Sequence, residues 1–300
     1  MQNKIAHIFP AFVLKYTGKE LNVINKYPND FNHKVNLANE LLNLDLSGFD
    51  IENNNFITQE LENQILSYIF SCTFSDILYN LKKSPNIISG FSMGLYSALY
   101  HSKSISFNTG LQLIKEVYID IKQIFDNERH LMASVIGFNK SDLKSLISNS
   151  KSVEIAIENG SFSFVISGKE VEIKPLMQKL QLEGAVHVSL FNVSFPYHSK
   201  ILSNHKLVFE KIVAKYKIDA PKTPIMSMIS QIELSTKKQV SNEIVKNITQ
   251  PLSFYKTIKE LNSLGTKQFI EVGADSSLLK SSKFIDGDFD FQAIAKGKIL

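Results

Sequence analysis

The sequence is poor in cysteine and in long apolar segments. Cys72 is its one cysteine, so no internal disulfide can form, and a single thiol within the apolar stretch 65–74 fits a reducing compartment. No apolar run is long enough to span a membrane. Residues 5–13 after Lys4 loosely resemble a signal sequence, but Pro10 interrupts them and no small-residue cleavage site follows. We therefore expect a cytoplasmic protein.

Arginine is equally scarce, since Arg129 is the only one, and the positive charge comes from lysines. The formal net charge is +4, but the lysines form no dense block. Nucleic acid is therefore not required as a partner, and we expect none. A lysine-rich solvated surface and a surface that meets an acidic protein both remain open.

The segment 87–99 has the pattern of a nucleophile elbow. A short apolar run leads into Gly90, Ser92 and Gly94, spaced as Gly-x-Ser-x-Gly, and a helical pattern begins at once. The glycines lack the Cβ atoms that would collide where strand and helix come close, so the turn pushes the serine hydroxyl into the open. The backbone N–H of Met93 would point at an oxyanion formed there. A plain strand–turn–helix junction is the alternative, because short patterns also arise by chance.

A serine hydroxyl needs a base to become a nucleophile, and histidine has a suitable proton affinity near neutral pH. Of seven histidines, His198 lies in a rigid turn with Pro196, just before a predicted helix, where a base can lean over a cleft. His7 lies in the first predicted strand and is better explained as a hydrogen-bonded core or edge residue. The others have no turn or glycine context and are assigned to surface or scaffold: His33, His101, His130, His187 and His205.

Alternating helix and strand patterns predict an α/β protein with a mostly parallel sheet. Residues 130–193 change character, since their pattern runs βαββαβ, which is the ferredoxin-like order. With 300 residues and 44% hydrophobic content, the chain is large enough for a small domain within a large one. We expect a large domain of residues 1–129 and 194–300 and an inserted small domain of residues 130–193.

Helix ends are predicted from local signals. Asn108 is expected to cap a helix at 109–125. Further helices are expected at 36–44, 199–216 and 252–264.

These features together resemble the malonyl-CoA:acyl-carrier-protein transacylase family. Seven landmarks follow the family's order along the whole chain: Phe9-Pro10, Gly90–Gly94, Gly110–Leu113, Met132–Gly137, Asn159–Gly168, Val193–His198 and Phe269–Gly273. The resemblance implies a Ser-His acyltransferase of polyketide or fatty acid biosynthesis, with a hydrolase-like α/β domain, a ferredoxin-like insertion and a cleft between them. It also implies a monomer without a bound cofactor or metal, whose substrates are phosphopantetheine thioesters of coenzyme A or an acyl-carrier protein.

Carried over residue by residue, the resemblance makes Ser92 the acylated nucleophile and His198 its base. A main-chain carbonyl at Asn247 would orient the histidine, with helix capping as an equal alternative for this asparagine. The N–H groups of Met93 and Phe12 would form the oxyanion hole.

The chain departs from the family in the loop that supplies Phe12 and beside the serine. Ala11 and Val13 replace glycines, and valine tolerates positive φ badly, which puts the loop geometry in question. A main-chain N–H survives any substitution except proline, so Phe12 can still donate. Phe91 replaces a histidine and would make the wall of the acyl pocket apolar. These changes indicate altered acyl accommodation, with loss of activity as the alternative.

Malonyl-specific members of the family hold the substrate carboxylate with an arginine on the helix predicted at 109–125. The matching residue here is Val117. A plain core role is the alternative for Val117. Arg129 lies past the predicted helix end. Lys115 and Lys122 are the alternative point charges on this helix, but they fall off the Val117 stripe and should face solvent. Because a buried carboxylate without a partner is costly, the resemblance together with this substitution predicts neutral acyl groups, acetyl or longer.

Other functions compete with acyl transfer. In thioester hydrolysis, water would replace the acceptor thiol and stalled acyl chains would be cleared from carrier proteins. A non-catalytic docking protein would keep the fold, but the presence of Ser92 and His198 argues against it. A lipase-type esterase is disfavoured, because no His-Gly-Gly-type loop precedes the elbow and the βαββαβ segment is foreign to that class.

Overall fold

The larger of two sheets carries the first predicted strand and the elbow strand. This computed structural model describes residues 4–13, 25–46, 59–126, 128–191 and 193–297. The sheet order is β11-β10-β1-β2-β7-β8, and every neighbouring pair except β7–β8 is parallel. The α/β class with a mostly parallel sheet is thereby confirmed. The strands are β1 (Lys4–Phe9), β2 (Ile87–Gly90), β7 (Ile225–Met226), β8 (Glu233–Leu234), β10 (Thr266–Glu271) and β11 (Asp290–Ala293).

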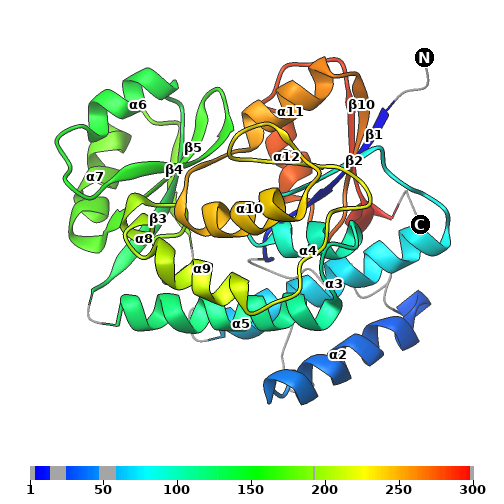
Figure 1. Cartoon of the computed structure of the whole chain (residues 1–300). Coiled ribbons are helices and arrows are strands. Elements are labelled where there is room, and N and C mark those ends of the chain that lie inside the picture. Colours follow the sequence, from blue (N-terminus) through cyan, green and yellow to red (C-terminus); the bar gives the residue numbers. More distant parts are fainter. Residues whose placement is uncertain (1–3, 14–24, 47–58, 127, 192, 298–300) are drawn as a thin grey trace.

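The second sheet has the order β6-β3-β5-β4-β9 and lies on the left of Figure 1 with two helices. Residues 130–190 run strand, helix, strand, strand, helix, strand, in the predicted order. The fifth strand comes from a distant part of the chain and pairs parallel with β4. The division into two domains at residues 130 and 193 stays a prediction. The elements are β3 (His130–Ile136), α6 (Lys140–Ile147), β4 (Glu154–Gly160), β5 (Ser163–Lys169), α7 (Glu170–Leu182), β6 (His187–Leu190) and β9 (Leu252–Ser253).

Two apolar cores lie on opposite faces of the larger sheet. Along β1, Phe9 packs into one core and Ile8 into the other, as the alternation of strand side chains requires. The second core packs against α11 (Phe254–Ser263) and reaches the second sheet at Met132 and Val165. Helices of the first core are α2 (Pro28–Leu42), α3 (Glu60–Asn80), α4 (Gly94–His101), α5 (Phe107–Ile124), α9 (Lys206–Ala214) and α10 (Lys237–Thr249). Short helices are α8 (Lys200–Ser203), α12 (Ser277–Ser282) and the 3-10 turn Ile294–Lys296.

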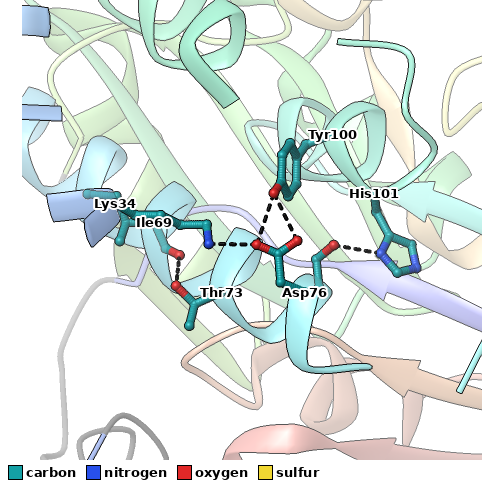
Figure 2. A network of polar contacts seen from close by, with 7 residues as sticks. Lys34, Ile69, Thr73, Asp76, Tyr100 and His101 are labelled. Carbon is teal, nitrogen blue, oxygen red and sulfur yellow. Dashed lines mark hydrogen bonds and ion pairs between the residues drawn. The ribbon is translucent and has the colours of Figure 1, made fainter. Parts of the chain in front are cut away.

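Polar side chains link three helices of the first core (Figure 2). Asp76 of α3 forms an ion pair with Lys34 of α2, with 2.6 Å between Nζ and Oδ2. It also accepts a hydrogen bond of 2.8 Å from the hydroxyl of Tyr100 on α4.

None of the described helices is long and apolar enough to cross a membrane.

A chain of two histidines links β1 to the same helices. Nδ1 of His7 lies 3.1 Å from Nε2 of His101, whose Nδ1 lies 2.7 Å from Oγ of Ser75. Burial lowers the pKa of His7 to about 3 and that of His101 to about 4, so both rings are neutral at pH 7. The prediction of a hydrogen-bonded core role for His7 is confirmed.

Several helix boundaries differ from those predicted. The helix expected at 36–44 begins earlier, at Pro28, because proline suits the first helical turn. The helix expected at 199–216 is two helices, α8 and α9, with His205 as the N-cap of the second.

The region around α10 and β9 shows two more differences. Helix α10 was not predicted, although Thr236 and Gln239 form a capping box that signals its start. The helix expected at 252–264 begins two residues later, because Leu252 and Ser253 are a strand. The Ser253 hydroxyl then caps α11 by accepting the Lys256 N–H at 3.1 Å.

Ser106, and not Asn108, caps α5. Its hydroxyl oxygen accepts the Thr109 N–H at 3.1 Å, and its backbone is extended, as an N-cap requires. Asn108 is an exposed residue inside the first turn. The prediction was wrong by two residues, because both side chains are good caps and only the backbone distinguishes them.

Ser106→Ala should therefore lower the free energy of unfolding by about 1 kcal/mol. Asn108→Ala should be neutral or slightly stabilising, because alanine is the better helix former at an exposed helical position. Urea unfolding of both variants, followed by circular dichroism, measures the difference. If Asn108→Ala were the more damaging change, the helix would begin where the sequence alone suggested.

Candidate active site

Ser92 lies at a sharp turn between β2 and α4, with φ of +55°. A Cβ on Gly90 would lie 2.4 Å from the Leu95 Cα, and a Cβ on Gly94 would lie 2.3 Å from the carbonyl oxygen of Phe9. Since both contacts are with backbone, only glycine permits this approach of strand and helix. The strained serine and its two glycines have the arrangement expected of a nucleophile elbow.

The structure brings Ser92 and His198 together across 106 residues of sequence. Oγ of Ser92 lies 2.7 Å from Nε2 of His198, and Nδ1 of His198 lies 2.6 Å from the carbonyl oxygen of Asn247. A carbonyl can only accept, so Nδ1 carries the hydrogen and Nε2 accepts from the serine hydroxyl. This tautomer is the one that a general base needs.

His198 is held rigidly and kept neutral. Its φ is +60°, and its N–H donates to the carbonyl of Ile248 at 3.2 Å. Burial lowers the pKa of His198 to about 4, although the hydrogen bond to the Asn247 carbonyl favours the protonated ring. The ring is therefore free to accept a proton at neutral pH.

Asn247 makes a second contact with the elbow. Its side-chain Nδ2 donates to the carbonyl oxygen of Ser92 at 3.0 Å. The residue lies inside α10, whose C-cap is Gln250, so helix capping does not explain it. One asparagine thus contacts both the serine and the histidine.

Two cavities meet at the Ser92–His198 pair. The larger has a volume of about 450 Å³ and a mostly apolar lining that includes Phe91, Met132 and Phe191. The ring of Phe91 meets that of Phe254 edge-on at 6.1 Å. The smaller cavity, of about 40 Å³, lies on the α5 side.

The smaller cavity contains the position expected to bind the acyl group. Val117 of α5 lines it, together with Met93 and Phe12. Lys115 lines neither cavity. It is half-buried rather than facing solvent as expected, and its Nζ donates to the Leu42 carbonyl at 2.6 Å. Two further cations of the sequence, Lys122 and Arg129, are exposed and line neither cavity.

The loop at residues 11–13 avoids the strain expected of it. None of Ala11, Phe12 and Val13 has a positive φ. Val13 is buried, and its N–H donates to Oγ of Ser67 at 3.0 Å. Phe12 lines both cavities beside Ser92, so the loss of the glycines is accommodated by an ordinary backbone.

One site residue was missed by sequence reasoning. Tyr197 lines both cavities, and its hydroxyl donates to the buried carboxylate of Glu60 at 2.6 Å. No local pattern signals this contact, because 137 residues separate the two. Among the described residues, no group of three or more histidine, cysteine or acidic side chains is arranged to hold a metal.

The neutral state of His198 predicts how the reactivity of Ser92 depends on pH. Its labelling by a fluorophosphonate should be constant above about pH 6 and fall about tenfold per pH unit below about pH 4, because protonated Nε2 cannot accept a proton. Intact mass against time gives the rate, and circular dichroism at each pH checks folding. A midpoint near 6.5 would mean that the ring is not desolvated.

Comparison with known proteins agrees with this geometry. The chain is 26% identical over 281 residues to the polyketide biosynthesis protein ThaF of Burkholderia thailandensis, a match that spans 91% of this chain and 23% of that protein. It is 25% identical over 290 residues to the malonyl CoA-acyl carrier protein transacylase of Buchnera aphidicola, covering 93% of each.

A solved structure shows the same fold. It is that of a malonyl-transacylase in complex with its type II polyketide synthase acyl-carrier protein. It superposes with a TM-score of 0.87 and 17% identity, over 97% of this chain and 95% of that one. Residues 79–284, more than half of the chain, match the acyl transferase domain family. Together with the elbow serine, this match shows that the chain belongs to the acyl transferase domain family.

Proposed function

We propose that this protein transfers an acyl group from a thioester of coenzyme A or an acyl-carrier protein to the phosphopantetheine thiol of a carrier protein. The observation that carries the proposal is the 2.7 Å contact between Oγ of Ser92 and Nε2 of the neutral His198. The family match and the named activities of the relatives support the same reaction class.

The reaction would proceed in two matched halves. Nε2 of His198 takes the proton of Ser92 as Oγ attacks the thioester carbonyl carbon, and the same proton then goes to the sulfur as the carbon–sulfur bond breaks. The acceptor thiol reverses these steps on the acyl serine. The N–H groups of Met93 and Phe12 are the proposed donors to the oxyanion in each half.

Among the described residues, the group that contacts Nδ1 of His198 is a main-chain carbonyl and not a carboxylate. The carbonyl of Asn247 accepts the Nδ1 hydrogen at 2.6 Å and so holds the tautomer in which Nε2 is free. Because the ring is buried, the imidazolium that forms during each transfer is short-lived, which favours prompt return of the proton to the leaving thiolate.

The acyl group would be neutral. Val117 lies in the smaller cavity beside Ser92 and His198, where a malonyl carboxylate would find no arginine or lysine among the lining residues. An unpaired carboxylate in such a place is costly, whereas an acetyl or other neutral group is not. Phe91 adds an apolar wall on the side of the larger cavity, through which the thioester arm would reach the serine.

Partner, assembly and location follow from the same proposal. We assign an acyl-carrier protein and an acyl-CoA as substrates, with no bound cofactor, in polyketide or fatty acid biosynthesis. The monomeric state and the cytoplasmic location stay predictions.

The nucleophile and the base are tested by covalent loading. Ser92→Ala should abolish the acyl adduct formed with a panel of acyl-CoAs, and His198→Ala should slow it by about 10²–10⁴-fold, the usual contribution of a general base. Intact mass follows the adduct, and His33→Gln, at an exposed position on α2, serves as the control.

The fate of the adduct decides between the competing reactions. Transfer to an added carrier protein supports the proposal. Rapid loss to water without an acceptor would make the protein a thioester hydrolase. Full adduct formation by Ser92→Ala would remove the serine from the mechanism, and the lack of any adduct in the unmodified protein would point to a docking role.

The acyl preference is tested at Val117, which lines the smaller cavity. Val117→Arg should raise the ratio of malonyl to acetyl loading by about 10–100-fold, because a charged hydrogen bond is worth about 1.5–3 kcal/mol. Val117→Met is the matched control, since it lengthens the side chain without charge. Faster loading of malonyl than of acetyl by the unmodified protein would show that Val117 does not set the preference.

A further inference from the structure

The loop that carries His198 is attached to a buried carboxylate on another helix. Glu60, in the first turn of α3, is fully buried, with 0% of its surface exposed. It belongs to neither cavity lining and does not touch Ser92 or His198. The mechanism above therefore gives it no role.

Glu60 holds the loop at two points. Oε2 accepts the backbone N–H of Ser194 at 3.1 Å, and Oε1 accepts the hydroxyl of Tyr197 at 2.6 Å. Gln64, one turn further along α3, donates from Nε2 to the Tyr197 hydroxyl oxygen at 3.1 Å and to Oε1 of Glu60 at 3.2 Å. The tyrosine hydroxyl thus donates to one residue and accepts from the other, which leaves it a single orientation.

Both points lie on the N-terminal side of the strained residue, His198. Ser194 stands near the start of the loop, and Tyr197 immediately precedes His198, whose φ of +60° is rarely adopted by a residue with a side chain. Such a backbone persists only where its surroundings determine it. The contacts of Glu60 supply that determination from the N-terminal side, while the Asn247 and Ile248 carbonyls supply it from α10.

The surroundings of the Glu60 carboxyl group suit a hydrogen-bond acceptor that is held in one place. Burial raises the pKa of Glu60, and the donors on Tyr197, Ser194 and Gln64 oppose that rise. No lysine or arginine pairs with it among the described residues. After burial, the charge of Glu60 is the next cause of the raised pKa of Tyr118. Three donors directed at one carboxyl group suit its ionised form, which can only accept.

We propose that Glu60 is a positioning residue that sets the Nε2 of His198 against Ser92 by fixing the part of the loop that precedes the histidine. This inference rests on the proposed function, because it assigns Glu60 to the same serine–histidine pair. It predicts a loss of serine reactivity that is not a loss of folding or of binding.

The test compares Glu60→Ala, Glu60→Gln and Tyr197→Phe with Glu62→Ala as the matched control. Glu62 lies in the same helical turn but is partly exposed. A fluorophosphonate is the probe, and labelling over a range of its concentrations separates the maximal rate on Ser92 from the concentration giving half that rate. Thermal unfolding of each variant is measured alongside.

Glu60→Ala should lower the maximal labelling rate by up to about 10²-fold, since a displacement of about 1 Å can cost that much, and should change the half-saturating concentration by less than about threefold. Glu60→Gln should restore part of the rate, because its amide oxygen still accepts one bond. Tyr197→Phe keeps the ring and should show a smaller loss in the same direction. Glu62→Ala should label as the unmodified protein does.

The outcomes separate the two levels of the proposal. If folded Glu60→Ala and Tyr197→Phe both label at the maximal rate of the unmodified protein, the positioning role is overturned and the acyl transfer proposal stays intact. A rise in the half-saturating concentration with no change in the maximal rate would also overturn the positioning role, in favour of a binding role. If Glu60→Ala does not fold, Tyr197→Phe alone decides between these results. Absence of labelling in the unmodified protein would instead overturn the nucleophile itself.

Discussion

The hydrogen bond between Nδ1 of His198 and the Asn247 carbonyl is the interaction on which the rest of the site depends. It fixes the ring tautomer, and therefore the direction in which a proton can move between Ser92 and the imidazole. The same asparagine donates from its side chain to the Ser92 carbonyl. Helix α10 is thus the common support of nucleophile and base, and both lose their support if its last turn moves.

The residues that line the smaller cavity are uncharged, whereas Asp275 and Lys280 line the larger one. The base is uncharged because burial lowers its pKa to about 4, its orienting partner is a carbonyl, and the cavity at Val117 contains no cation. The buried carboxylate of Glu60 is separated from the histidine by Tyr197, whose hydroxyl donates to it. The proposed preference for a neutral acyl group rests on the lack of a cation in the smaller cavity.

Local signals made part of this site predictable. The elbow is specified within five residues, because glycine is needed at two close approaches. The turn at Pro196 singled out His198, which lies within hydrogen-bond distance of Ser92 in the structure. The contact between Glu60 and Tyr197 was not predictable, since nothing near Glu60 indicates that it meets a residue 137 positions later. The predicted start of α5 was wrong because two good capping residues compete there. Strand β9 was missed because two residues are too short to show a strand pattern.

The two-residue strand β9 has a mechanical consequence. Leu252 and Ser253 pair with β4 of the second sheet, while the Ser253 N–H donates to the Met228 carbonyl just beyond β7 of the larger sheet at 2.8 Å. Hydrogen bonds of β9 therefore link the two sheets immediately before the start of α11. Any motion that separated the two sheets at this point would have to break the β9–β4 pairing or the bond between Ser253 and Met228. If the βαββαβ segment were produced without β9, the edge of β4 would be exposed and could pair with strands of other chains.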